Sequence, residues 1–72
     1  MEQNTNKQKA FDAYKAMGSL LTLKQTVEAL RQKSDNKVIR GSYIMVIDAI
    51  DNEINRLNGL ADYYDRQVNN SY

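Results

Sequence analysis

Eight residues in the second half of this 72-residue chain recur at alternating steps of four and three, and this repeat sets the fold class. They are Tyr43, Ile47, Ile50, Ile54, Leu57, Ala61, Tyr64 and Val68. Residues with this spacing lie along one side of an α-helix, as in the interface of a coiled coil. The repeat predicts a helix over about residues 42–67, with Ser42 as its N-cap.

A similar series runs through the first half of the chain and predicts a helix over about residues 10–32. Its members are Ala13, Ala16, Leu20, Leu23, Val27 and Leu30. Residues 1–9 are polar and are expected to be flexible, with Thr5 and Asn6 both candidates for the N-cap. A turn is expected over about residues 33–41, within which residues 36–40 fit either a loop or an extra helical turn.

The two series match when the helices run in opposite directions. Leu30 then faces Tyr43 and Ala13 faces Ala61, and the register holds over the whole length. Residues 1–41 carry eight Lys and Arg against four Asp and Glu, whereas residues 42–72 carry two against five, so the pairing also joins unlike charges. We therefore predict an all-α fold, an antiparallel two-helix hairpin resembling a coiled coil, as a single domain over residues 1–72.

A chain this short has difficulty in stabilising its fold alone, because a single core below about 70–80 residues rarely supplies more than about 3–5 kcal/mol. The sequence contains neither Cys nor His, so disulfides and structural zinc sites are excluded. Burial against a partner, either another protein or a second copy, is the remaining source of stability.

Several large apolar residues lie outside the two series, and a single hairpin interface cannot bury them. We predict that they contact a partner. They are Phe11, Tyr14, Met17, Leu21, Ile44, Val46, Leu60 and Tyr63. In the alternative arrangement, the first helix breaks at Gly18 and the segment before it folds back as a short additional helix. Phe11, Tyr14 and Met17 then become ordinary core residues.

The sequence lacks His, the most common general base, and Cys, a strong nucleophile, so no catalytic set can be assembled. The chain is therefore predicted to be a non-enzymatic binding protein without a metal or cofactor. The carboxylates at Asp48, Asp51, Asp62 and Asp65 are expected to form an exposed acidic face that pairs with Lys and Arg of the first helix. A net charge of +1 argues against direct nucleic-acid binding. With neither a long apolar run nor a secretory signal, we expect a cytoplasmic protein.

Residues 41–64, from Gly41-Ser42-Tyr43 to Asp62-Tyr63-Tyr64, resemble the second helix of the small co-chaperones of type III secretion needle subunits, the YscE/PscE/EscE family. The similarity covers about residues 20–66 and consists of helix pattern and length. It implies a bacterial cytoplasmic hairpin, linked to virulence, that docks on a larger helical-repeat chaperone. The two proteins together keep the needle subunit monomeric.

A second resemblance is to the Hha/YmoA nucleoid-associated regulators. It rests on Thr22-Leu23-Lys24 through Glu28 and on Ala49-Ile50-Asp51 through Leu57, and it implies binding to a nucleoid protein with Asp51 as the matching acid. The arginine-rich first helix and the carboxy-terminal Trp segment of that family are missing. A third possibility is a homodimeric coiled-coil adaptor.

Overall fold

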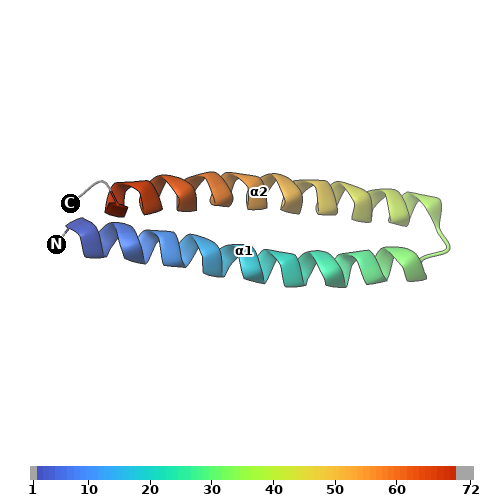
Figure 1. The fold of residues 1–72 in the computed structure, drawn as a ribbon. Coiled ribbons are helices and arrows are strands. Elements are labelled where there is room, and N and C mark those ends of the chain that lie inside the picture. The colour runs from blue at the N-terminus through green and yellow to red at the C-terminus, as the bar shows by residue number, and fades with distance from the viewer. Residues whose placement is uncertain (1, 70–72) are drawn as a thin grey trace.

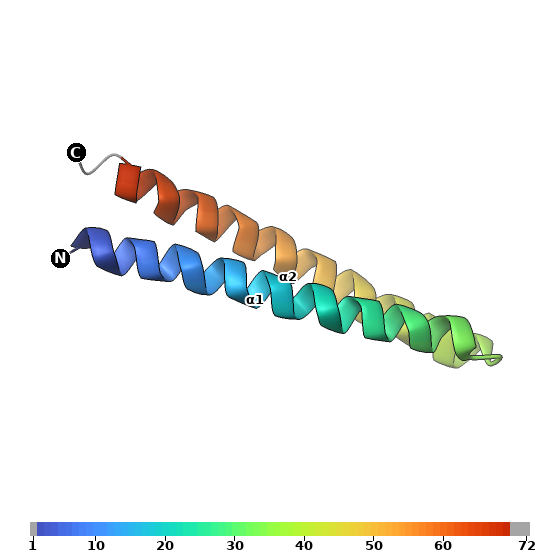
Figure 2. The same ribbon diagram turned by 60° about the horizontal axis from the view of Figure 1, so that its bottom comes forward.

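The computed structural model describes residues 2–69 and their side chains from Thr5 to Val68. Two helices, α1 (Glu2–Lys33) and α2 (Lys37–Asn69), run antiparallel and pack against each other (Figure 1). The molecule is a rod measuring 56 × 14 × 12 Å. The helices cross at a small angle, so that they overlap near the loop in the view of Figure 2. The predicted antiparallel hairpin is therefore confirmed.

The connection between the helices is shorter than expected, because it occupies only residues 34–36. Asn36 is the N-cap of α2: its Oδ1 accepts hydrogen bonds from the backbone N–H groups of Val38 at 2.9 Å and Ile39 at 3.3 Å. These bonds satisfy two donors that the helix itself leaves unpaired. Residues 37–40 are thus helical, and the expectation that Ser42 caps the helix is wrong, since its hydroxyl donates to the carbonyl of Val38 inside α2 at 3.1 Å.

The first helix is longer than expected and unbroken. It begins at Glu2, so residues 2–9, which were expected to be flexible, are helical, and Thr5 and Asn6 lie inside the helix rather than at its cap. Met1 lies outside the described residues. Gly18 is accommodated within the helix, and the alternative with a separate short amino-terminal helix is not found. Alanine, glutamine and lysine, which favour helices, are frequent in residues 2–16 and explain the extension.

The interface side of α2 is the one that its sequence predicts, because all eight residues of the repeat are buried or half-buried. Val27 of α1 packs with Ile47 and Ile50 of α2 in the main apolar cluster. Leu20, Tyr43 and Ile54 surround this cluster. Toward the helix ends opposite the loop, the buried residues are the alanines Ala10, Ala13 and Ala61. The buried residues are thus bulky in the loop half, whereas in the other half they are alanines, next to the half-buried Leu57, Tyr64 and Val68.

The interface side of α1 differs in part from the expected one. The residues that repeat along it are Ala10, Ala13, Met17, Leu20, Lys24, Val27 and Arg31. Ala13, Leu20 and Val27 belong to the expected series, whereas Leu23 and Leu30 are 48% and 45% exposed. Lys24 instead lies toward α2, where its Nζ forms an ion pair with Asp51 at 2.8 Å. The helix is therefore rotated from the expected orientation, and two leucines lie beside the interface.

Neither helix, over the residues described, contains a stretch apolar enough to cross a bilayer.

Candidate docking surface

The hairpin has two long sides, called flanks here, where side chains border the helix–helix interface. Residues spaced by seven follow one another along a flank, because seven residues make nearly two helical turns. One side is the Tyr14 flank, which contains Tyr14, Leu21 and Glu28 of α1 and Ile44, Asp51, Asn58 and Asp65 of α2. The other is the Leu23 flank, which contains Lys9, Ala16, Leu23 and Leu30 of α1 and Ile39, Val46, Glu53, Leu60 and Gln67 of α2.

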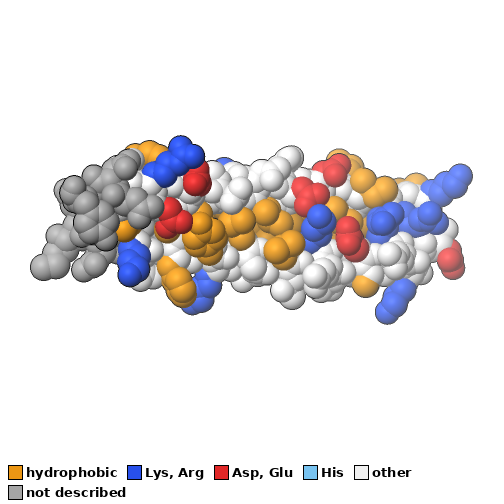
Figure 3. All heavy atoms as spheres, in the orientation of Figure 1, with side chains coloured by type: hydrophobic (Ala, Val, Ile, Leu, Met, Phe, Trp, Pro, Cys, Tyr) orange, Lys and Arg blue, Asp and Glu red, His pale blue; other side chains and the backbone are white. Residues whose placement is uncertain are grey.

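The Tyr14 flank is held by polar interactions between the helices. Tyr14 Oη donates a hydrogen bond to Asp65 Oδ2 at 2.7 Å, and the Lys24–Asp51 ion pair lies closer to the loop. The hydrogen bond to Asp65 raises the pKa of the Tyr14 hydroxyl, with smaller contributions from desolvation and the nearby carboxylates. The pKa of Lys24 is raised mainly by its hydrogen bond to Asp51. Figure 3 shows one face of the molecule, on which hydrophobic side chains lie along the middle of the rod and charged ones lie toward both of its ends.

The acidic residues are largely engaged locally. Asp62 pairs with Arg66 at 3.0 Å and Glu53 pairs with Arg56, both within α2. The expected pairing of acidic α2 with basic α1 is present at Lys24–Asp51, and Asp48 remains exposed. Within the described part of the chain, no three acidic side chains converge to form a metal site. These carboxylates therefore support the hairpin through local and interhelical pairs.

The Leu23 flank is much more apolar. Six of its nine side chains are apolar, and Leu23, Leu30, Ile39 and Val46 are all between 44% and 48% exposed. The four lie in the loop half of the hairpin, next to the main apolar cluster. A group of large exposed apolar side chains on one side of a small protein is typical of a protein-binding surface.

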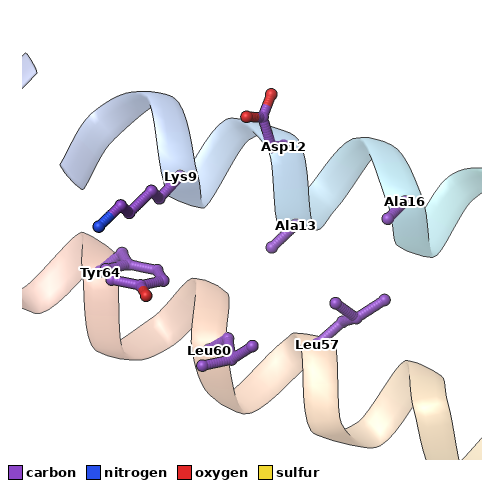
Figure 4. Close-up of a pocket in the computed structure, with 7 residues that line it drawn as sticks. All are labelled: Lys9, Asp12, Ala13, Ala16, Leu57, Leu60 and Tyr64. Carbon is purple, nitrogen blue, oxygen red and sulfur yellow. The ribbon is translucent and has the colours of Figure 1, made fainter. Parts of the chain in front are cut away.

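The half of the Leu23 flank farther from the loop contains an open hollow of about 340 Å³. It is lined by Lys9, Asp12, Ala13, Ala16, Leu57, Leu60 and Tyr64 (Figure 4). The hollow exists because Ala13 and Ala16 are short and leave space above Leu57 and Leu60. Lys9 closes one end, with its ammonium 5.4 Å from the centre of the Tyr64 ring. A hollow of this kind can receive an apolar side chain of a partner.

The eight residues predicted to contact a partner do not form one surface. Tyr14, Leu21 and Ile44 lie on the Tyr14 flank, and Phe11 is exposed on the outer side of α1. Val46 and Leu60 lie on the Leu23 flank, and Tyr63 is exposed next to it, with its ring against Tyr64. Met17 is half-buried at the helix–helix interface. Because Met17 contributes to the hairpin interface, the stripe predicted on α1 is divided.

Sequence reasoning missed Leu23, Leu30 and Ile39 as surface residues. The repeat along α1 predicts both leucines at the interface, and Ile39 falls in the segment that fits either a loop or an extra helical turn. A signal was present, because Leu23 and Leu30 follow Ala16 at steps of seven and form a second apolar column beside Ala13, Leu20 and Val27. Two adjacent columns make a helix that can bury apolar surface on two sides.

Comparison of the chain with protein-family models, with curated proteins and with solved structures finds no significant match.

Proposed function

We propose that this chain is a non-enzymatic binding subunit that packs its Leu23 flank against the helices of another polypeptide. The observation that carries the proposal is the placement of α1: Lys24 and Arg31 face α2, while Leu23 and Leu30 remain exposed. If the hairpin were the complete functional unit, apolar burial would favour the leucines at its interface. The leucines are thus available to a second interface.

The exposed area supports the same proposal. The accessible surface is 5573 Å², whereas a compact monomer of 8.3 kDa exposes about 4,600 Å². The excess of about 1,000 Å² is similar to the roughly 800 Å² that each partner contributes to a stable protein interface. Among the side chains described, from Thr5 to Val68, the buried core consists of six apolar residues, three of them alanine. Such a small core gives the isolated hairpin little stability, and burial against a partner would increase it.

The specific form of this function that we propose is a co-chaperone of the type III secretion kind. The resemblance of residues 20–66 to that family motivates the assignment, and the hairpin architecture and exposed apolar flank are compatible with docking on a helical-repeat chaperone. A nucleoid-binding regulator remains the alternative. It predicts further short helices, whereas residues 2–69 form two long ones, and Asp51 is paired with Lys24.

Site-specific photo-crosslinking in the native cell tests this proposal. A photoreactive residue at Leu23 should yield an adduct with a defined helical protein, whereas the same residue at Met45, which is 73% exposed on the outer side of α2, should not. A larger chaperone in the adduct supports the co-chaperone form, and a nucleoid protein supports the alternative. Equal labelling from Leu23 and Met45 would contradict docking through the Leu23 flank.

A variant pair then measures the contribution of the flank to binding. Leu23→Glu should weaken the complex by about tenfold or more, because it places a charge in an apolar interface. Met45→Glu should leave the affinity unchanged. Leu21→Asp tests separately whether the Tyr14 flank also contributes to binding. Met17 is unsuitable for such a test, since a charge there would disrupt the hairpin itself.

A further inference from the structure

We propose that, in the free protein, a second copy of this chain covers the Leu23 flank and that the two hairpins are reversed end to end in a four-helix bundle. This inference rests on the proposed function, because it names an occupant for the same surface. The Tyr14 flank faces outward in such a dimer. A larger partner that binds the Leu23 flank would replace the second copy.

The size of the flank fits a stable dimer. A face of a rod measuring 56 × 14 × 12 Å has a footprint of roughly 700–800 Å², close to the area each subunit contributes to a standard interface. Short-loop hairpins that present an apolar side can complete a four-helix bundle with coiled-coil-like packing. A two-fold dimer of this kind buries the same flank of both copies and leaves neither flank open.

The shape of the flank selects the reversed orientation. Glu53 is the midpoint of α2 (Lys37–Asn69), and Val46 and Leu60 lie seven residues on either side of it. Reversal about this midpoint therefore places Val46 of one copy opposite Leu60 of the other. On α1, it places Leu23 and Leu30 opposite the segment that contains Ala16 and Lys9. Bulky side chains of each copy thus enter the hollow of the other, twice per dimer.

The same-direction alternative fits less well. It would place bulky loop halves against each other and leave the two hollows facing each other unfilled. It would also bring together two basic loop ends, since residues 28–46 carry Arg31, Lys33, Lys37 and Arg40 against Glu28 and Asp35. Reversal separates these ends by nearly the length of the rod, far beyond the screening length of about 8 Å. The two Glu53 side chains approach each other at the midpoint, and each has Arg56 of its own helix as counter-charge.

Analytical ultracentrifugation of the full chain from low micromolar to near-millimolar concentration tests the dimer. We expect a mass of about twice 8.3 kDa. Val46→Glu should shift the species to a monomer, whereas the adjacent Met45→Glu, outside the flank, should remain dimeric. Circular dichroism shows whether each variant keeps its helices, and Leu23→Gln provides a milder second test. A monomer at every concentration, or a dimer unaffected by both flank variants, would overturn the proposal.

The orientation has a separate readout. Because the chain lacks cysteine, Asp35→Cys introduces a single labelling site in the loop. Spin labels at this site should be roughly 50–55 Å apart in the reversed dimer, given the rise of 1.5 Å per residue along the eighteen positions from Asp35 to the Glu53 midpoint in each copy. A distance below about 20 Å would indicate the same-direction dimer and would refute the reversed bundle.

The two proposals fail in different ways. Loss of the dimer together with intact crosslinking of another protein at Leu23 would reject the second copy and retain the binding function. A dimer with the expected spin-label distance, and no crosslinked protein other than this chain, would support the second copy and reject docking on a larger chaperone.

Discussion

Tyr14 and Asp65, separated by 51 positions in the sequence, join the two helices through a 2.7 Å hydrogen bond between the phenol and a carboxylate oxygen. The bond lies in the half of the hairpin where the buried interface consists of alanines. Short side chains give little apolar burial there, so a directed polar contact helps to fix the distance and register of the helix ends.

Replacing Tyr14 with Phe should reduce stability slightly at neutral pH and should make stability less sensitive to alkali. The pKa of Tyr14 is raised in the folded chain, so its contribution is complete below the unfolded-state pKa of about 10. That contribution is lost as the pH rises through the folded-state value. Urea unfolding of the parent and of Tyr14→Phe at about pH 8 and about pH 11 measures this difference. Tyr63→Phe serves as the control, and an equal alkaline loss in the parent and Tyr14→Phe would contradict the assignment.

The second helix should depend on Asn36 for its start. Asn36→Ala removes the acceptor for the N–H groups of Val38 and Ile39 and should lower the free energy of unfolding by about 1 kcal/mol. Ser42→Ala should change it by less than about 0.5 kcal/mol, because Ser42 lies on the exposed side inside α2. Chemical denaturation compares the two variants. A larger loss from Ser42→Ala than from Asn36→Ala would indicate that α2 begins at Ser42, as the sequence predicts, and would contradict an N-cap at Asn36.

Gly18→Ala should stabilise the hairpin by about 0.5–1 kcal/mol, because alanine loses less backbone entropy in a helix. A Cβ atom added at Gly18 meets nothing within 4 Å, and the residue has no positive φ. Thermal unfolding followed by circular dichroism provides the measurement. A decrease in the midpoint would indicate that the chain needs a break at this residue, which is the arrangement with a separate amino-terminal helix.

Lys24→Leu should raise the thermal midpoint. The Lys24 side chain is 27% exposed at the helix–helix interface, so leucine there gains apolar burial. The ion pair that is lost is partly exposed, and such pairs contribute little net stability. Gln25→Leu, on the exposed side of α1, is the matched control and should leave the midpoint nearly unchanged. If Lys24→Leu lowered the midpoint, the pair with Asp51 would be essential to the register.

The sequence predicted the fold class and the whole interface side of α2, because the repeat from Tyr43 to Val68 has a single consistent apolar column. The interface side of α1 was harder. Ala13, Leu20 and Val27 are flanked by a column with Leu23 and Leu30 on one side and a column with Met17 and Lys24 on the other. Hydrophobicity alone favours the leucines, whereas the structure places Lys24 near Asp51, a contact that depends on the other helix.

The sequence predicted exposed apolar residues, and the structure divides them between two flanks. Exposed apolar residues beyond the hairpin interface were expected, and most of them are exposed. On α2, Ile44 lies on one side of the repeat and Val46 and Leu60 lie on the other, so their division follows from the sequence. On α1, the rotation brings Met17 into the helix–helix interface, and this rotation depends on contacts with α2. The hollow between Ala16 and Leu60 could not be predicted either, because it results from the packing of two short residues against a helix more than forty positions away.

The three-residue connection at residues 34–36 brings the beginning of α1 and the end of α2 to the same tip of the rod (Figure 1). Any domain or tag attached beyond either helix would therefore start from that one tip, leaving the opposite tip unobstructed. In the reversed pair of hairpins, the attachment tips of the two copies would point away from each other. Such a pair would be a rigid spacer that holds the two attached domains apart by about the length of one hairpin.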